Sequence, residues 1–175
     1  EEKLAALDYA IPEAYEIITF YKAVIISARG IIAMAARYSR LAKKLMEEEE
    51  NLQRKAELKE ISEICEWIPA NPARTFREAI QLLWFVQMGC HIEGNGPSYS
   101  PGRVDQYLYP FFKKDLEERR LNRKEALEII ECLYIKFAEN TWFLSKNAAM
   151  YFAGYQPYQN ITVGGVKPDG SDATN

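Results

Sequence analysis

Apolar residues recur with a helical period along most of the chain. From Glu13 to about Glu50 nothing interrupts this pattern except Gly30, which a helix tolerates. The first half of this stretch is apolar on nearly every side, as is typical of a helix buried against other parts of a protein. The second half is charged. The pattern therefore predicts one long helix with a covered first half and a solvated end.

Two further helices are predicted after this one. The first covers Leu52 to Trp67, and Pro69 and Pro72 end it and impose an extended linker. The second covers Thr75 to Gly94, with Glu78 in the capping-box position relative to Thr75. Three helices in succession predict a local bundle.

The next helical segments carry clear start signals. Ser100 and Pro101 form a cap and first-turn pair, and Pro110 is expected to kink or restart the helix that they open. A further helix from Asn122 to about Lys146 has Glu125 as its capping-box partner. Residues 1–146 are therefore predicted to be helical.

The pattern changes in residues 151–175, which are predicted to form a strand and turns. Asn160 to Gly164 is rich in β-branched residues, and Gly164-Gly165 and Pro168 to Gly170 are turn signals. A single short strand cannot form a sheet alone. It either pairs with strands outside this chain, or the prediction of a strand is wrong. The fold class is mainly α with about one strand.

Bulk properties exclude several classes of function. The 175 residues are 48% hydrophobic and 27% charged, which indicates a globular chain of one-domain length. A net charge of −3 provides no basic field for nucleic acid or an anionic membrane. The apolar run Ala23 to Ala36 is shorter than a membrane span, and no signal segment is present. We expect a cytoplasmic protein with no nucleic-acid or membrane role, and an internal piece of a longer chain.

Cysteine and histidine content limits the chemistry further. Three scattered cysteines suit reduced thiols better than a disulfide framework or a zinc site. Cys90, His91 and Glu93 lie within four residues, which would suit a thiol nucleophile or radical site, but the pattern favours Cys90 as a small apolar residue on a buried helix face and assigns it no catalytic role. The one histidine has no second ligand or base in view, which argues against metal and triad chemistry.

The most informative segment is the polar loop, Glu93 to Tyr107, which separates two strongly apolar helical segments. Its glycines allow positive φ and close approach to a ligand. Asn95 and Ser98 could hydrogen-bond a small polar substrate, or they could satisfy local backbone groups in an ordinary connecting loop. Both interpretations stay open on spacing alone.

Three charged residues of the polar loop are expected to have structural roles. Asp105 suits the positive end of the dipole of the following helix. Arg103 could pair across the loop with Glu93. A clamp on the loop is therefore predicted for this set.

Three blocks, Asn71 to Phe85, Glu93 to Glu117 and Gln159 to Asn175, together resemble the glycyl radical enzymes. The similarity is to the pyruvate formate-lyase-like domain in its glycerol, propanediol and choline lyase branch. It is collinear and covers nearly the whole chain, as a partial domain over residues 1–175. It implies a ten-stranded α/β barrel, to which this chain would supply outer helices and one strand, Asn160 to Gly164.

The resemblance also implies radical chemistry in the whole protein. In this family an S-adenosylmethionine-dependent iron–sulfur activase installs a glycyl radical, which oxidises a cysteine to a thiyl radical that attacks a small-molecule substrate. The thiyl cysteine lies in a G-C-x-E motif and the radical glycine in R-V-x-G-Y. Neither motif occurs in these residues, so this chain alone is expected to be catalytically silent. A homodimer from an anaerobe is implied as well.

The resemblance places substrate-binding residues in the polar loop. Where dehydratase relatives read G-H-S, this chain has Gly96, Pro97 and Ser98. Ser98 is thereby implied as a substrate contact, whereas Pro97 offers neither an N–H nor an imidazole. This departure weighs against glycerol or propanediol as substrate and leaves C–O, C–N or C–C cleavage of another small polar substrate open. The alternative is a helical scaffold or binding module that keeps the fold without radical chemistry.

Overall fold

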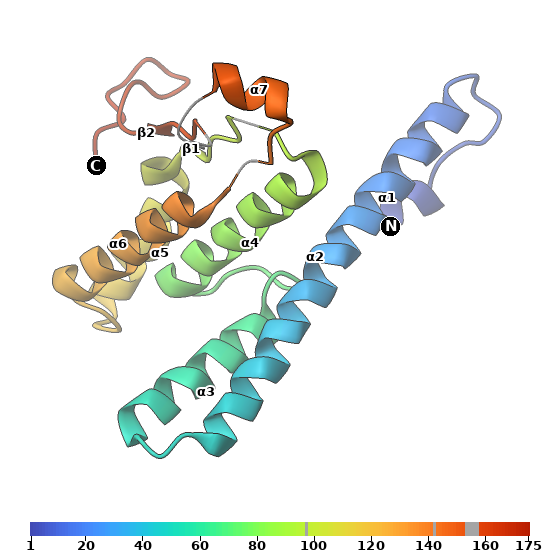
Figure 1. Cartoon of the computed structure of the whole chain (residues 1–175). Coiled ribbons are helices and arrows are strands. Elements are labelled where there is room, and N and C mark those ends of the chain that lie inside the picture. Colours follow the sequence, from blue (N-terminus) through green and yellow to red (C-terminus); the bar gives the residue numbers. More distant parts are fainter. Residues whose placement is uncertain (97, 142, 153–157) are drawn as a thin grey trace. The chain divides into compact units, whose positions relative to one another are not determined.

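The computed structural model describes residues 1–96, 98–141, 143–152 and 158–175. The chain divides into two compact units, an N-terminal unit, Glu1–Ala70, and a C-terminal unit, Asn71–Asn175. The described part is mainly helical, as the sequence predicted (Figure 1). Its elements are α1 (Glu2–Ala5), α2 (Ala14–Glu48), α3 (Leu52–Trp67), α4 (Phe76–Gly94), β1 (Gly102–Arg103), α5 (Val104–Glu117), α6 (Arg123–Glu139), α7 (Lys146–Tyr151) and β2 (Ile161–Thr162).

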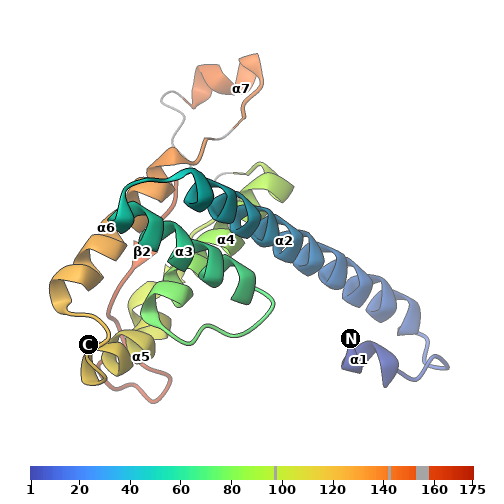
Figure 2. The same cartoon turned by 90° about the horizontal axis from the view of Figure 1, so that it is seen from below.

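The N-terminal unit is dominated by α2 and α3, and the predicted limits of both helices are confirmed to within two residues. α3 turns back along the C-terminal half of α2 (Figures 1 and 2). Ala35, Ser39 and Ala42 lie one helical turn apart and are all buried. These small side chains allow the two helices to approach closely. Between the helices the hydroxyl groups of Ser39 and Ser62 form a buried hydrogen bond, with their oxygens 3.0 Å apart.

The first half of α2 exposes large apolar side chains. Phe20 is 64% exposed and Ile26 is 69% exposed. By length and composition α2 could cross a membrane, although a core helix of a soluble protein passes the same test. The argument that the apolar run is too short for a span is thus wrong, because the run lies within a continuous helix of 35 residues.

The C-terminal unit has its hydrophobic core between α4, α5 and α6. The core side chains are Phe76, Ala79, Ile80, Leu108, Ala126, Leu133 and Phe137. α4 belongs to this unit and packs on α5 and α6, whereas the sequence prediction grouped it with the two helices that precede it. α5 continues through Pro110, so the predicted restart there is wrong.

The two residues predicted to start a capping box, Thr75 and Asn122, both accept backbone hydrogen bonds. Asn122 and Glu125 form the complete reciprocal capping box at α6. Thr75 caps α4 by accepting from the Glu78 N–H, but the Glu78 carboxylate reaches back to the Arg74 N–H at 2.6 Å instead of to Thr75. The box at α4 is therefore displaced by one residue.

Two predictions are corrected by the short parallel strand pair: the helix start at Ser100 and the lack of a partner for the strand within the chain. Ser100 and Pro101 do not open a helix: Gly102 and Arg103 form β1, and α5 begins only at Val104. β2 therefore has a partner within the chain, because the two strands pair in parallel with Gly102 opposite Ile161. The sequence signal at Ser100 failed because its hydroxyl accepts the Asn160 N–H across the pair, at 3.0 Å.

The end of the helical region also differs from prediction. α6 ends at Glu139 because Asn140 adopts an extended conformation, and α7 follows with Ser145 as its N-cap. The turn predicted at Pro168 to Gly170 is confirmed, with the Lys167 N–H donating to the Ser171 carbonyl at 2.8 Å and φ of +83° at Gly170.

Candidate functional site

The polar loop starts at the C-terminal end of α4, where Asn95 takes the left-handed conformation with φ of +39°. Its side chain is committed to the backbone of Phe143: Nδ2 donates to the carbonyl at 2.9 Å, and Oδ1 accepts the N–H at 3.1 Å. Asn95 thus ties the loop to a segment 48 residues later in the chain.

Ser98 lies at the exposed turn of the loop and also has positive φ, +68°. Its carbonyl accepts a long hydrogen bond of 3.4 Å from the Ser100 hydroxyl. Its own hydroxyl bonds to none of the residues that the structure describes, so this group is available to another molecule. Pro97, the residue before it, lies outside the described residues.

Tyr99 packs over the end of α4. Its ring meets the His91 ring edge-on, with centroids 5.2 Å apart. A Cβ at Gly94 would overlap the Tyr99 hydroxyl, and one at Gly96 would come within 3.2 Å of it. Glycine is therefore favoured at position 94 by the close approach of the Tyr99 ring, which a side chain there would displace, rather than by an unusual φ. Burial lowers the pKa of His91 below its ordinary value of 6.5, so the ring is neutral near pH 7.

The far side of the loop is fastened to the segment around β2. Arg103 donates from Nη1 to the Val166 carbonyl at 2.8 Å and from Nη2 to the Gly164 carbonyl at 2.5 Å. Asp105 accepts the Gly164 N–H at 2.7 Å. This bond and one from Gln106 lower the pKa of Asp105 against the opposing effect of burial, so the carboxylate stays ionised.

The proposed ion pair between Arg103 and Glu93 is not formed. The Arg103 guanidinium turns to backbone carbonyls instead, and Glu93 is exposed at the end of α4. The parallel pairing of β1 with β2 brings Gly164 and Val166 within reach of Arg103, and this pairing was not expected from the sequence. Asp105 is in the first turn of α5, as predicted.

Gln87 is the residue that sequence reasoning missed. It is 5% exposed, and its Nε2 donates to the Tyr99 carbonyl and to Oε1 of Gln159 at 3.2 Å. The His91 Nε2 atom lies 3.4 Å away. One glutamine inside an apolar helix carries no motif, and its partners lie 12 and 72 residues away in the chain. Only its polarity among buried positions could have drawn attention to it.

These contacts make the polar loop a surface turn fixed on both flanks. Asn95 and Gln87 hold its first part, and Arg103 and Asp105 hold its second part. Such an arrangement presents the Ser98 hydroxyl on a fixed backbone, which suits recognition of a polar group. Among the described residues no group of histidine, cysteine and acidic side chains could hold a metal ion.

A sequence model of the pyruvate formate lyase-like family matches residues 1–175, the whole chain. The chain belongs to this family. It is 42% identical over 177 residues to the isethionate sulfite-lyase of Nitratidesulfovibrio vulgaris, covering 99% of this chain and 21% of that protein. The chain thus spans about a fifth of the length of the curated relatives that it matches.

Solved structures agree with the family assignment. A propanediol-dehydrating enzyme of Roseburia inulinivorans superposes with a TM-score of 0.93 at 37% identity, covering 99% of this chain and 21% of that one. A glycyl radical enzyme of Archaeoglobus fulgidus gives 0.89 at 41% identity, covering 99% and 22%. The family resemblance inferred from the three sequence blocks is confirmed.

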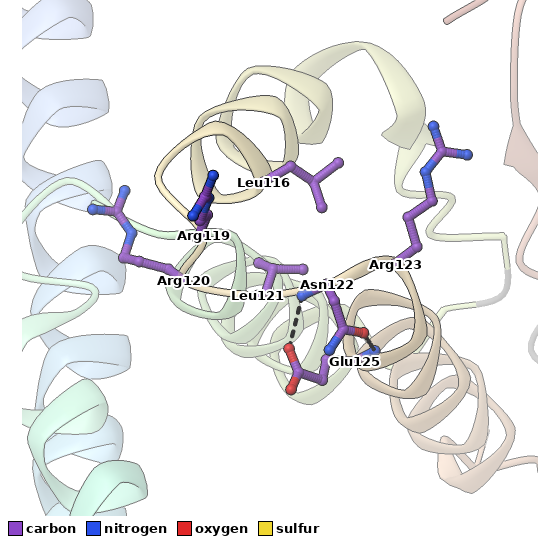
Figure 3. A pocket seen from close by; sticks show the side chains of 7 residues that line it. All are labelled: Leu116, Arg119, Arg120, Leu121, Asn122, Arg123 and Glu125. Carbon is purple, nitrogen blue, oxygen red and sulfur yellow. Dashed lines mark hydrogen bonds between the residues drawn. The ribbon is translucent and has the colours of Figure 1, made fainter.

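A hollow lies at the turn between α5 and α6 of this pyruvate formate lyase-like chain (Figure 3). It encloses about 530 Å³ and is lined by Leu116, Arg119, Arg120, Leu121, Asn122, Arg123 and Glu125. The polar groups of Asn122 and Glu125 are used in the cap of α6, and Arg120 pairs with Asp115 at 2.7 Å. The hollow lies at the opposite end of α5 from the polar loop, so it is not part of the same site.

The two exposed thiols of the chain stand apart from the loop's hydrogen-bond network. Cys90 is on the exposed side of α4 and Cys132 is exposed on α6. Cys65 is buried, and burial raises the pKa of its thiol to about 11. A buried, protonated thiol is unreactive. The interpretation of Cys90 as a buried packing residue is wrong, since α4 turns this position outward.

Proposed function

We propose that the whole protein is a glycyl radical lyase or dehydratase that cleaves a C–O, C–N or C–C bond of a small polar substrate. The family match over residues 1–175 supports this, as does the likeness to lyases and dehydratases along 99% of the chain. In this proposal the chain contributes outer helices and the short β1–β2 pair to a ten-stranded α/β barrel. The apolar half of α2 would pack against the remainder of the protein.

The role proposed for this chain is substrate binding through Ser98. The observation that carries it is the Ser98 hydroxyl: it has no partner among the described residues and stands on a backbone fixed from both flanks. Pro97 and the backbone of Asn95 would shape the same surface. Arg103 and Asp105 would hold it, whereas Glu93 has no contact that assigns it a clamping role.

The radical chemistry is assigned to other parts of the protein. Neither G-C-x-E nor R-V-x-G-Y occurs in these residues, so no radical step passes through this chain's side chains. An S-adenosylmethionine-dependent iron–sulfur activase is the proposed partner. We further propose a cytoplasmic homodimer that binds neither nucleic acid nor membranes, in line with the net charge of −3.

Electron paramagnetic resonance tests the enzymatic proposal directly. The whole protein, treated with a competent activase and S-adenosylmethionine without oxygen, should show a glycyl radical doublet. No signal under conditions that activate a known relative would favour the alternative, a non-catalytic scaffold that keeps the fold.

Replacing Ser98 by alanine tests the binding role. Loss of a hydrogen bond to a charged substrate group costs about 1.5–3 kcal/mol, so KM should rise roughly ten- to a hundredfold while the radical yield stays normal. Ser171→Ala is the matched control, because Ser171 is another exposed serine in a turn of the same unit. Unchanged kinetics in Ser98→Ala would contradict the substrate-binding role and identify Ser98 as an ordinary loop residue.

A substrate panel addresses the identity of the substrate. It should contain diols, amines, carboxylic acids and isethionate, the compound in the relative's name. Because Pro97 replaces the histidine of the dehydratase pattern, we expect glycerol and 1,2-propanediol to be poor substrates. Efficient turnover of either diol would contradict this expectation.

A further inference from the structure

We propose that Gln87 is a positioning residue for substrate binding, because it fixes the backbone of the polar loop beside Ser98. The inference rests on the proposed function for its connection to substrate. Its structural part rests on the contacts of Gln87 alone. Gln87 is in the middle of α4, is 5% exposed and belongs to a helix anchored in the core of the C-terminal unit.

The orientation of the Gln87 amide follows from the chemistry of its partners. The Tyr99 backbone carbonyl can only accept a hydrogen bond, so the Gln87 atom that faces it is the donor Nε2. The Gln159 atom facing the same Nε2 is then the acceptor Oε1, at 3.2 Å. The amide therefore links the residue after Ser98 to the residue before Asn160, whose N–H is bonded to Ser100.

His91 completes the surroundings of the Gln87 amide, with its Nε2 3.4 Å from Gln87 Nε2. Burial lowers the pKa of this histidine, so its ring is neutral near pH 7. The Tyr99 ring stands edge-on against His91, so side-chain packing and the carbonyl bond fix Tyr99 together.

This geometry makes Gln87 a stronger determinant of the loop than the exposed contacts are. Ser100 holds the loop through a long bond to Ser98 and one bond to Asn160, both near the surface. Gln87 bonds from a buried position, where water cannot replace a lost partner and an orphaned carbonyl is costly. Removing its donors should therefore let residues 98–100 move, and the Ser98 hydroxyl with them.

The test uses Gln87→Met in the whole protein, which keeps the length and apolar volume of the side chain and removes its donors. We expect KM to rise about tenfold with kcat changed far less and radical content normal. Hydrogen exchange of the amides of residues 98–100 should become faster. Gln159→Met should have a smaller effect, and the double variant should differ little from Gln87→Met, since both remove one shared link.

Ser62→Ala is the control for a general loss of stability, because it also deletes a buried polar group but lies in the N-terminal unit. It should lower thermal stability and leave KM unchanged. An unchanged KM in Gln87→Met, or an equal rise in Ser62→Ala, would overturn the proposal. Absence of both radical and turnover in the unsubstituted protein would sink the proposed function instead, while loop exchange would still decide whether Gln87 holds the loop.

Discussion

The N-terminal unit joins two long helices through alanines and a serine pair, whereas the C-terminal unit buries aromatic and branched side chains from three helices. The difference extends to polar groups. In the C-terminal unit, buried Asp115, Glu78 and Gln87 each bond to backbone or charged partners. In the N-terminal unit the ion pairs are exposed, as in Lys43 with Glu66. The unit that presents the polar loop is therefore the one that buries charged side chains, Glu78 and Asp115.

The largest contrast is expected between two phenylalanines. Phe137 is 6% exposed and packs against Trp84, so Phe137→Ala should cost about 3–5 kcal/mol of local stability. Phe20 is 64% exposed, and Phe20→Ala should cost under about 0.5 kcal/mol in the 175-residue chain. Native-state hydrogen exchange of helical amides measures both. Similar losses of local stability in the two variants would contradict the contrast between the two units.

A second contrast concerns buried polar side chains. The Asp115 carboxylate is 2% exposed, accepts the Phe76 N–H at 2.7 Å and pairs with Arg120. Asp115→Ala should cost about 2–3 kcal/mol, because it leaves a buried N–H without an acceptor. Asp115→Asn, which keeps an acceptor, should recover part of that loss. Ser62→Ala in the N-terminal unit should cost only about 1 kcal/mol. A cost for Asp115→Ala no larger than this would contradict the assigned role.

Lowering the pH should also reduce the stability of the two units to different extents. Burial opposes ionisation of Glu78, but hydrogen bonds from Arg74 outweigh it and lower the pKa of Glu78 below its ordinary 4.5. The folded state therefore holds its proton less tightly than the unfolded state, and the stabilisation is complete above pH 4.5 and lost as pH falls through the folded pKa. Glu78→Gln should flatten this acid limb in a thermal melt series. Glu66→Gln, in an exposed pair, should leave it unchanged.

The smallest contrast compares two helix caps of the same residue type. Asn122 accepts from the N–H groups of Lys124 and Glu125 within a reciprocal box, whereas Asn51 accepts only from Arg54. Asn122→Ala should cost about 1 kcal/mol and Asn51→Ala somewhat less. Amide exchange in the first turns of α6 and α3 reports each. A larger loss at Asn51 would reverse the ranking.

The sequence predicted those elements whose signals are local. Helix limits at α2, α3 and α4 followed from periodicity and from Thr75, and the capping box at Asn122 followed from spacing. Local sequence signals gave wrong predictions where the side chain concerned forms a hydrogen bond with a segment far away in the chain. Ser100 resembles a helix cap, but its hydroxyl accepts a hydrogen bond from the N–H of Asn160, which lies 60 residues later in the chain and across the strand pair.

The sequence was sufficient to predict where the candidate site lies, but not which residues contact one another within it. The polar loop and the family resemblance were readable from glycines, Asn95 and Ser98. The partners of Arg103 and the role of Gln87 were not, because both depend on bonds to Gly164 and Gln159 that only the folded topology creates. Short-range patterns do not encode which buried donor meets which remote carbonyl.

The overlap that any Cβ at position 94 would make with the Tyr99 hydroxyl has an evolutionary consequence. The two positions are constrained as a pair: a side chain at position 94 requires the Tyr99 ring to move aside, or a smaller residue at position 99. Homologues should therefore show coupled substitution there, and libraries that diversify this surface should vary both codons together.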